Sequence, residues 1–226
     1  MDISEKHAIV TGTSKGIGLA ISKKLIDKGV VVAGFSRSKP VDKELLSSKN
    51  FHHISVDLTK EDEVDDAFKS VQELFDDTIH FLINNAGKGY KGPTHEMSSE
   101  DWRNLFDLNV HGLFYVTKRV LPLMQKQQFG HVINISSGAG TNGIAEMTAY
   151  SASKHAVVGI SDSLHKEYRN DGIKVTNLSP GSVDTGFSSS NKNKLKPEEM
   201  ADSVAHILSM PQNFHYTDVQ VRPLQP

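Results

Sequence analysis

Apolar residues along the chain follow two alternating patterns. Short apolar runs, each long enough for one strand, occur at residues 7–11, 30–35, 51–56, 79–83, 131–135, 173–178 and 217–221. Between them, apolar residues recur at helical spacing after Gly18, after Thr59, over 99–127, over 150–168 and after Pro197. This alternation has no linker and no internal repeat, so it predicts a single α/β domain over residues 1–226. We expect a doubly wound, Rossmann-type parallel sheet of about seven strands with helices on both faces.

The sequence also predicts one helix N-cap and one loop. Thr59 is a candidate N-cap for the helix that follows it, since acidic residues crowd the first turn of that helix. Residues 186–196 are rich in Ser, Asn and Lys and have little apolar periodicity, which predicts a mobile loop. Pro197 and the two acids after it are typical of a helix start.

A glycine-rich segment, Gly12-Thr13-Ser14-Lys15-Gly16-Ile17-Gly18, joins the first predicted strand to the first predicted helix. Glycines permit a tight turn and close approach of a ligand, and a helix start offers free N–H groups to an anion. The segment therefore predicts a pyrophosphate site and a dinucleotide cofactor, with an ordinary strand-to-helix turn as the alternative. Its spacing is G-x-x-x-G-x-G, which departs from the generic G-x-G-x-x-G.

The end of the second predicted strand indicates which dinucleotide binds. An acid there would hold a ribose 2′-OH, whereas a basic residue would accommodate a 2′-phosphate. The strand ends in Ser36-Arg37-Ser38-Lys39 with no acid, and Lys15 in the glycine turn offers a second positive charge. The sequence predicts NADP(H) in preference to NAD(H), with a solvated basic loop as the alternative.

Small and polar residues follow three other predicted strands, at the edge where an open α/β sheet binds its ligand. They are Asn84-Asn85-Ala86-Gly87, Ser136-Ser137-Gly138 and Ser179-Pro180-Gly181, which are equally suited to forming turns. Asn109 stands among apolar residues of the helix over 99–127. A buried carboxamide costs free energy unless its groups are bonded, so we expect Asn109 to have defined partners.

Tyr150 and Lys154 are four residues apart near the start of a predicted helix, and such residues share one face. A lysine close to a phenol favours the phenolate, and a tyrosine tuned in this way can transfer a proton near neutral pH. Tyr150 is therefore a candidate acid/base. The alternative is a pair on an exposed helix face.

The composition limits which catalytic groups and which kinds of partner this chain can use. The 25 basic and 27 acidic residues give a net charge of -2, so nothing in the bulk charge indicates a nucleic acid or a membrane as partner. The chain has no cysteine, which excludes thiolate chemistry and Cys-ligated metals. His52 and His53 would point to opposite faces of a strand, so we expect no metal site there. No apolar stretch is long enough to span a membrane. We expect a cytoplasmic protein whose partner is a small molecule or another copy of itself.

Together these motifs resemble the short-chain dehydrogenase/reductase family over nearly the whole chain. The match comprises the glycine turn from Thr11-Gly12 to Gly18, Asn84 to Gly87, Asn109, Ser137, Tyr150 with Lys154, and Pro180-Gly181 leading to Thr185, in family order and near family spacing. The glycine spacing that departs from the generic fingerprint is the one this family uses.

The resemblance implies a role for each matching residue. Tyr150 would be the general acid in carbonyl reduction, with Lys154 lowering its pKa and binding the nicotinamide ribose. Ser137 would bond the carbonyl oxygen, and Asn109 would hold a water that links Lys154 to solvent. Other implied cofactor contacts are the phosphate turn at Gly12, Ser14, Lys15 and Ile17, the 2′-phosphate site at Ser36 and Arg37, the adenine site at Asp57 and Leu58, the adenosine ribose at Asn85, and the carboxamide at Val183 and Thr185. Gly16, Gly18, Ala86, Gly87, Pro180 and Gly181 complete the predicted cofactor site.

These expectations amount to an NADPH-dependent oxidoreductase acting on a small carbonyl compound or alcohol. The alternatives are a dinucleotide-binding sensor without turnover and, within the family, an epimerase or dehydratase. Positional inference places Lys88, Tyr90, Met147 and Phe187 at the substrate pocket. Members of this family commonly form homodimers or homotetramers through the two long helices over 99–127 and 150–169, although those apolar faces could also serve only the sheet.

Overall fold

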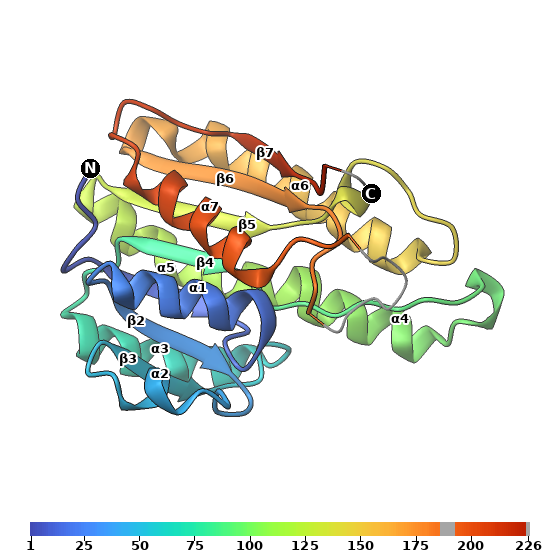
Figure 1. The fold of residues 1–226 in the computed structure, drawn as a ribbon, viewed down its shortest axis with the longest axis horizontal. Coiled ribbons are helices and arrows are strands. Elements are labelled where there is room, and N and C mark those ends of the chain that lie inside the picture. Colours follow the sequence, from blue (N-terminus) through green and yellow to red (C-terminus); the bar gives the residue numbers. More distant parts are fainter. Residues whose placement is uncertain (186–192, 225–226) are drawn as a thin grey trace.

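Seven parallel strands form one sheet in the order β3-β2-β1-β4-β5-β6-β7, which confirms the predicted Rossmann-type architecture. The computed structural model describes residues 1–185 and 193–224. The strands are β1 His7–Thr11, β2 Val31–Ser36, β3 Phe51–Ser55, β4 Phe81–Asn84, β5 Gly130–Ile135, β6 Ile173–Pro180 and β7 Asp218–Val221. Because all of them run in the same direction, their carboxyl ends meet at one edge, on the side of α4 and the C-terminus in Figure 1.

Helices cover both faces of the sheet (Figure 1). The α-helices are α1 Gly16–Asp27, α2 Lys43–Ser47, α3 Glu61–Phe75, α4 Ser99–Phe106, α5 Leu113–Gln127, α6 Thr148–Tyr168 and α7 Pro197–Ser209. Apolar residues of α1 and α7 form one core with one face of the sheet, while α3 and α5, with the end of α6, form the other. Adjacent strand residues contribute to opposite cores, as Ile9 and Val10 do, so the strands are apolar on both sides.

The short turns are η1 Thr94–Glu96, η3 Gly138–Gly140 and η4 Arg169–Asp171, and η2, over Asp107–Gly112, is a π-helical segment between α4 and α5. The helix predicted over 99–127 is therefore confirmed as a continuous helical stretch with a wider turn in its middle. The spacing of the apolar residues did not predict this turn. Asn109 lies in this turn, and single π turns are frequent at functional sites.

The N-cap predicted at Thr59 is wrong. The helix α3 begins at Glu61, and Lys60 occupies the cap position. The Thr59 hydroxyl instead donates to Asp57 Oδ1 at 2.8 Å. The acidic first turn is confirmed, with Glu61 and two further acids.

A buried polar network ties the strand ends to α5 and α6. Asn84 Nδ2 donates to Asn134 Oδ1 at 2.8 Å and to Thr117 Oγ1 of α5 at 2.9 Å. Asn134 Nδ2 donates in turn to Ser161 Oγ of α6 at 2.9 Å. Buried carboxamides specify a unique arrangement when they are bonded in this way, so the network fixes α5 and α6 against β4 and β5.

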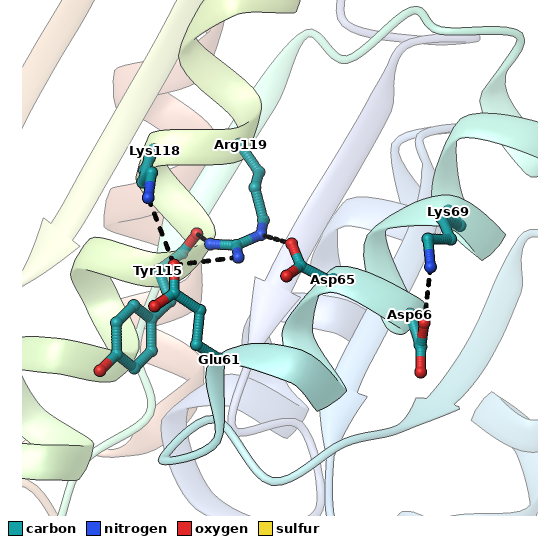
Figure 2. Close-up of polar contacts among 7 residues, drawn as sticks. All are labelled: Glu61, Asp65, Asp66, Lys69, Tyr115, Lys118 and Arg119. Atoms are coloured by element: carbon teal, nitrogen blue, oxygen red, sulfur yellow. Dashed lines mark hydrogen bonds and ion pairs between the residues drawn. The ribbon is translucent and has the colours of Figure 1, made fainter.

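An ion-pair network joins α3 to α5 on the outside of the second core (Figure 2). The Arg119 side chain is only 11% exposed and bonds to Asp65 and, at 3.1 Å, to Glu61, while its Nη1 donates to the Tyr115 carbonyl at 2.8 Å. The nearby pair of Lys69 and Asp66 is a contrast, because both side chains are more than 70% exposed. Only the first network is sheltered enough to contribute appreciably to stability.

Candidate active site

The glycine turn between β1 and α1 is shaped by close backbone approaches. Gly12 has a φ of +74°, and a Cβ there would lie 2.9 Å from Asn85 Nδ2 and 3.0 Å from the Ala86 Cα. A Cβ on Gly18 would lie 2.3 Å from the Gly12 oxygen and 2.5 Å from Asn85 Nδ2. No side chain larger than hydrogen fits at either position, so the turn lies flat against the end of β4.

The start of α1 is open to an anion. Lys15 precedes the helix in extended conformation, its side chain is exposed, and neither it nor any acid caps the first turn. Gly16 has a φ of +61°, and a Cβ there would lie 3.2 Å from the Thr185 methyl carbon. The free N–H groups and the helix dipole make this cradle fit a pyrophosphate, with Thr185 beside it.

Ser36 and Arg37 at the end of β2 have different surroundings. The Ser36 hydroxyl is buried; it donates to the Ser38 carbonyl at 2.9 Å and lies 3.2 Å from both Thr13 Oγ1 and His53 Nε2. The Arg37 side chain is exposed, and no salt bridge of it occurs within the part of the chain that the structure describes. Arg37 is therefore the better placed of the two to meet a phosphate.

Asp57 and Leu58 follow β3, next to the end of β2. Burial acts to raise the pKa of Asp57, but hydrogen bonds from Thr59 and the charge of Arg37 lower it below its ordinary value. Leu58 is buried, and its carbonyl lies 2.9 Å from the place of a Cβ on Gly112, where the π-helical segment ends.

Ser137 and Tyr150 meet at the end of β5. Ser137 follows the strand and precedes η3, and its Oγ accepts from the Ala139 N–H at 3.1 Å. The Tyr150 hydroxyl, from the first turn of α6, lies close enough to the Ser137 side chain for that side chain to act on its pKa. The two hydroxyls that the sequence assigns to one carbonyl oxygen are therefore neighbours.

Lys154 and Asn109 both lie close to Gly87. The buried Lys154 ammonium is 5.8 Å from the centre of the Tyr150 ring and donates to the Ile135 carbonyl at 2.9 Å. A Cβ on Gly87 would lie 3.2 Å from Asn109 Oδ1 and 3.6 Å from Lys154 Nζ. The glycine therefore leaves space beside both groups.

The partners expected for Asn109 are present. Its Oδ1 accepts from the Lys88 N–H at 2.8 Å, and its Nδ2 donates to the Lys88 carbonyl at 2.9 Å and to Ser153 Oγ at 3.0 Å. The carboxamide thus joins the loop after β4 to α6. These bonds engage both ends of the side chain.

The electrostatics of the tyrosine differ from the expectation. Burial raises the pKa of Tyr150, and the Ser137 side chain is the opposing influence. Burial also lowers the pKa of Lys154 from 10.5 to about 8. Lys154 adjoins the phenol ring as predicted, but the pKa of Tyr150 is raised overall, because the effect of burial outweighs that of Ser137.

Comparisons with known proteins identify the family. The family model for short chain dehydrogenases matches residues 6–196. An uncharacterized oxidoreductase of Staphylococcus aureus is 34% identical over 229 residues, which cover 98% of this chain and 99% of that relative. The chain belongs to the short-chain dehydrogenase/reductase family.

Two solved structures show how closely the fold follows this family. An alcohol dehydrogenase from the archaeon Thermococcus sibiricus, complexed with 5-hydroxy-NADP, has a TM-score of 0.89 at 27% identity. The match covers 98% of this chain and 97% of the alcohol dehydrogenase chain. The closed form of a serine dehydrogenase complexed with NADP+ has a TM-score of 0.88 at 28% identity. The match covers 95% of this chain and 94% of the serine dehydrogenase chain. This chain is thus an oxidoreductase of the short-chain dehydrogenase/reductase family with NADP-bound structural neighbours.

In this short-chain dehydrogenase/reductase, two positioning residues had no role assigned from the sequence. Thr11 Oγ1 accepts from the N–H groups of Asn85 and Ala86 at 2.9 and 3.0 Å, which holds the loop after β4 against the glycine turn. Ser153 bonds Asn109 and also donates to the Tyr150 carbonyl at 2.8 Å. Thr11 directly precedes Gly12, and Ser153 directly precedes Lys154. This adjacency to residues with an assigned role was the signal in the sequence that could have indicated them.

The remaining predicted residues lie around the same edge of the sheet. Pro180 ends β6 and Gly181 follows it, while Val183 is buried and pairs with Leu195. Lys88 is exposed beside Asn109, and Tyr90 and Met147 are half-buried in the loops after β4 and η3. Phe187 and most of the loop predicted at 186–196 lie outside the described residues.

Two searches over residues 1–185 and 193–224 gave negative results. No helix there has the length and apolar character needed to cross a membrane. Nor does that part of the chain contain a cluster of three or more His, Cys, Asp or Glu side chains arranged to hold a metal ion.

Proposed function

We propose that this protein is an NADPH-dependent reductase that transfers hydride reversibly between NADP(H) and a ketone or aldehyde, or the corresponding secondary alcohol. The observation that carries the proposal is the placement of the Tyr150 hydroxyl beside the Ser137 side chain, which acts to lower its pKa, with the Lys154 ammonium 5.8 Å from the tyrosine ring. A protein that only sensed a dinucleotide would need no paired hydroxyl donors beside a buried lysine.

In the proposed reaction, NADPH supplies the hydride that reaches the carbonyl carbon. Ser137 donates a hydrogen bond to the carbonyl oxygen and stabilises the negative charge that develops there. Tyr150 gives that oxygen its proton, which leaves a phenolate beside the Lys154 ammonium. In the reverse direction Tyr150 accepts the proton of the alcohol.

Lys154 and Asn109 complete this set. With a pKa of about 8, Lys154 is mostly protonated near neutral pH, so it favours the phenolate once the proton has left Tyr150. Asn109 positions α6 against the loop after β4 and holds its Oδ1 near the lysine. Lys154 also binds the nicotinamide ribose in our proposal, so its loss affects binding as well as rate.

We propose the cofactor site as predicted from the sequence, with NADP(H) preferred. The uncapped start of α1 takes the pyrophosphate, and Arg37 with Lys15 takes the 2′-phosphate, because both side chains are exposed and no acid ends β2. The NADP complexes among the structural neighbours support this preference. Asp57, Leu58 and Asn85 line the adenosine half, and Val183 and Thr185 the nicotinamide half.

We also propose that residues 1–226 act as a single domain that assembles into a homodimer or homotetramer. Strands from residue 7 to residue 221 share one sheet, which supports the single domain. Trp102 of α4 and Phe114 of α5 are 38% and 50% exposed, which supports a partner surface on these helices. Light scattering of the purified protein tests this assembly, and a monomer at all concentrations would contradict it.

The proposed activity is tested by following NADPH absorbance with purified protein and a panel of carbonyl compounds: oxo acids, their esters, sugars, pterins, aromatic ketones and ketoacyl thioesters. NADH is run in parallel. The proposal predicts oxidation of NADPH with at least one carbonyl, at a higher kcat/KM than with NADH. NADPH binding without oxidation across the whole panel would favour a dinucleotide sensor instead.

A further inference from the structure

The segment after β7 crosses the carboxyl ends of the two neighbouring strands. The Gly181 N–H, just after β6, donates to the Val221 carbonyl at 2.7 Å. A Cβ on Gly181 would lie 3.1 Å from Pro223 Cδ and 3.5 Å from the Arg222 Cα. The chain at Arg222 is therefore seated against the end of β6, on the edge of the sheet that carries Ser137.

From there the Arg222 side chain reaches across to the end of β5. A Cβ on Gly138 would lie 2.5 Å from Nη1 of Arg222 and 3.2 Å from both Cζ and Nη2. The guanidinium thus occupies the space that a side chain at 138 would fill. Gly138 directly follows Ser137, and bond lengths limit the distance between Nη1 of Arg222 and the Ser137 hydroxyl to no more than about 10 Å.

The Arg222 charge is not neutralised by the protein around it. Over residues 1–185 and 193–224, its side chain has one hydrogen-bond partner, Gln220 Oε1 at 3.1 Å, and no salt bridge. A guanidinium carries five donors in a fork that matches a carboxylate, so most of its donors are available to a ligand. Arg37, the cation proposed for the cofactor, lies at the end of β2 on the opposite side of β1 and β4.

We propose that Arg222 binds the carboxylate of the substrate, so that this enzyme prefers short oxo acids and hydroxy acids over neutral carbonyl compounds. The inference rests on the proposed function. With one hydrogen bond of about 2.8 Å at the guanidinium and one at Ser137, both directed along the line between the two groups, a span of about 5 Å remains between carboxylate and carbonyl oxygens. Acids of about three to five carbon atoms fit this span.

The test compares kcat/KM with NADPH for pyruvate and methyl pyruvate, and for acetoacetate and methyl acetoacetate. For the wild-type protein we expect at least a tenfold preference for the acid in one of the pairs. Arg222→Gln should reduce this preference at least tenfold through a higher KM for the acid, while the ester value stays within about threefold. Arg222→Lys should restore part of the preference, because the charge remains without the fork.

Two further variants separate binding from folding. Gly138→Ala keeps Arg222 but displaces its flexible end, so it should lower the acid preference in a stable protein. Arg169→Gln removes an equal charge from an exposed site in η4, before the start of β6 at the opposite edge, and should leave the preference unchanged. A readout without turnover is calorimetric titration of the NADP⁺ complex with pyruvate, in which Arg222→Gln should weaken binding at least tenfold.

Equal kcat/KM for acid and ester in the wild-type protein would overturn this assignment and leave the proposed redox function intact. The same holds if Arg222→Gln keeps the preference, or if it lowers acid and ester alike, since Arg222 would then act only through packing on Gly138. Failure of the wild-type protein to reduce either member of both pairs, while it reduces another carbonyl, also overturns it. No turnover of any carbonyl would overturn the proposed function as well.

Discussion

Replacing Gly18 by alanine tests whether the glycine turn is built by contact with the end of β4. Gly18 is a buried position inside α1, where helix propensity alone favours alanine by about 1 kcal/mol. The new Cβ would lie 2.3 Å from the Gly12 oxygen and 2.5 Å from Asn85 Nδ2, and the first obstacle is backbone that cannot rotate away. Overpacking of this kind costs about 3 kcal/mol, so the net loss is about 2 kcal/mol.

The assay is thermal unfolding of Gly18→Ala by circular dichroism, with and without saturating NADPH. A loss of about 2 kcal/mol lowers Tm by about 4–8 °C in a protein of this size. The turn must also shift away from its ligand, so we expect the stabilisation by NADPH to shrink, with binding at least tenfold weaker.

Gly159→Ala is the matched control, since Gly159 also lies in a helix but has nothing within 4 Å of its Cβ position. It should raise stability by about 0.5–1 kcal/mol and leave NADPH binding unchanged. A Gly18→Ala protein with wild-type stability and full NADPH stabilisation would refute the steric account of the turn.

Three further predictions concern the cofactor, pH and packing. Arg37→Asp should shift the ratio of kcat/KM for NADPH over NADH toward NADH by at least tenfold, since an acid replaces the proposed phosphate ligand; an unchanged ratio would count against the site. Burial lowers the pKa of His80 and His215 from 6.5 to about 4. Their neutral forms therefore stabilise the fold fully above pH 6.5, and this stability, up to about 3 kcal/mol for each, is lost as pH falls from 6.5 toward 4. Urea unfolding at about pH 7 and about pH 4.5 measures this loss, and equal stability at the two values would contradict it. Arg119→Gln should cost about 1–3 kcal/mol in thermal unfolding, whereas Lys69→Gln should cost less than about 0.5 kcal/mol; equal costs would show that shelter from solvent does not matter here.

The sheet was predictable because its strands are covered on both faces. Such strands read as continuous apolar runs, and β1 begins and ends where its run does. Strand ends were less certain where tertiary partners decide them. Ile79, for example, belongs to an apolar run but donates its N–H to Gln127 Oε1, so β4 begins only at Phe81.

The clustering of the candidate site residues was predictable, and their electrostatics were less so. Several motif residues follow strand ends, and parallel strands bring those ends together, so Ser137, Asn85 and Gly181 had to lie along one edge of the sheet once the fold was correct. The pKa of Tyr150 depends on how much water its hydroxyl retains, and burial is a property of the assembled structure. The reach of Arg222 to Gly138 was likewise hidden, since it joins residues 84 positions apart across two strand ends.

Tyr150→Phe tests the central claim most directly, because it removes one hydroxyl and leaves the ring beside Lys154. The measurement pairs NADPH binding by fluorescence titration with turnover of the best carbonyl substrate. We predict a Kd for NADPH within about threefold of wild type and a kcat at least about 100-fold lower, since the proton donor is gone. A Tyr150→Phe protein that keeps most of its turnover would contradict the assignment of Tyr150 as the acid.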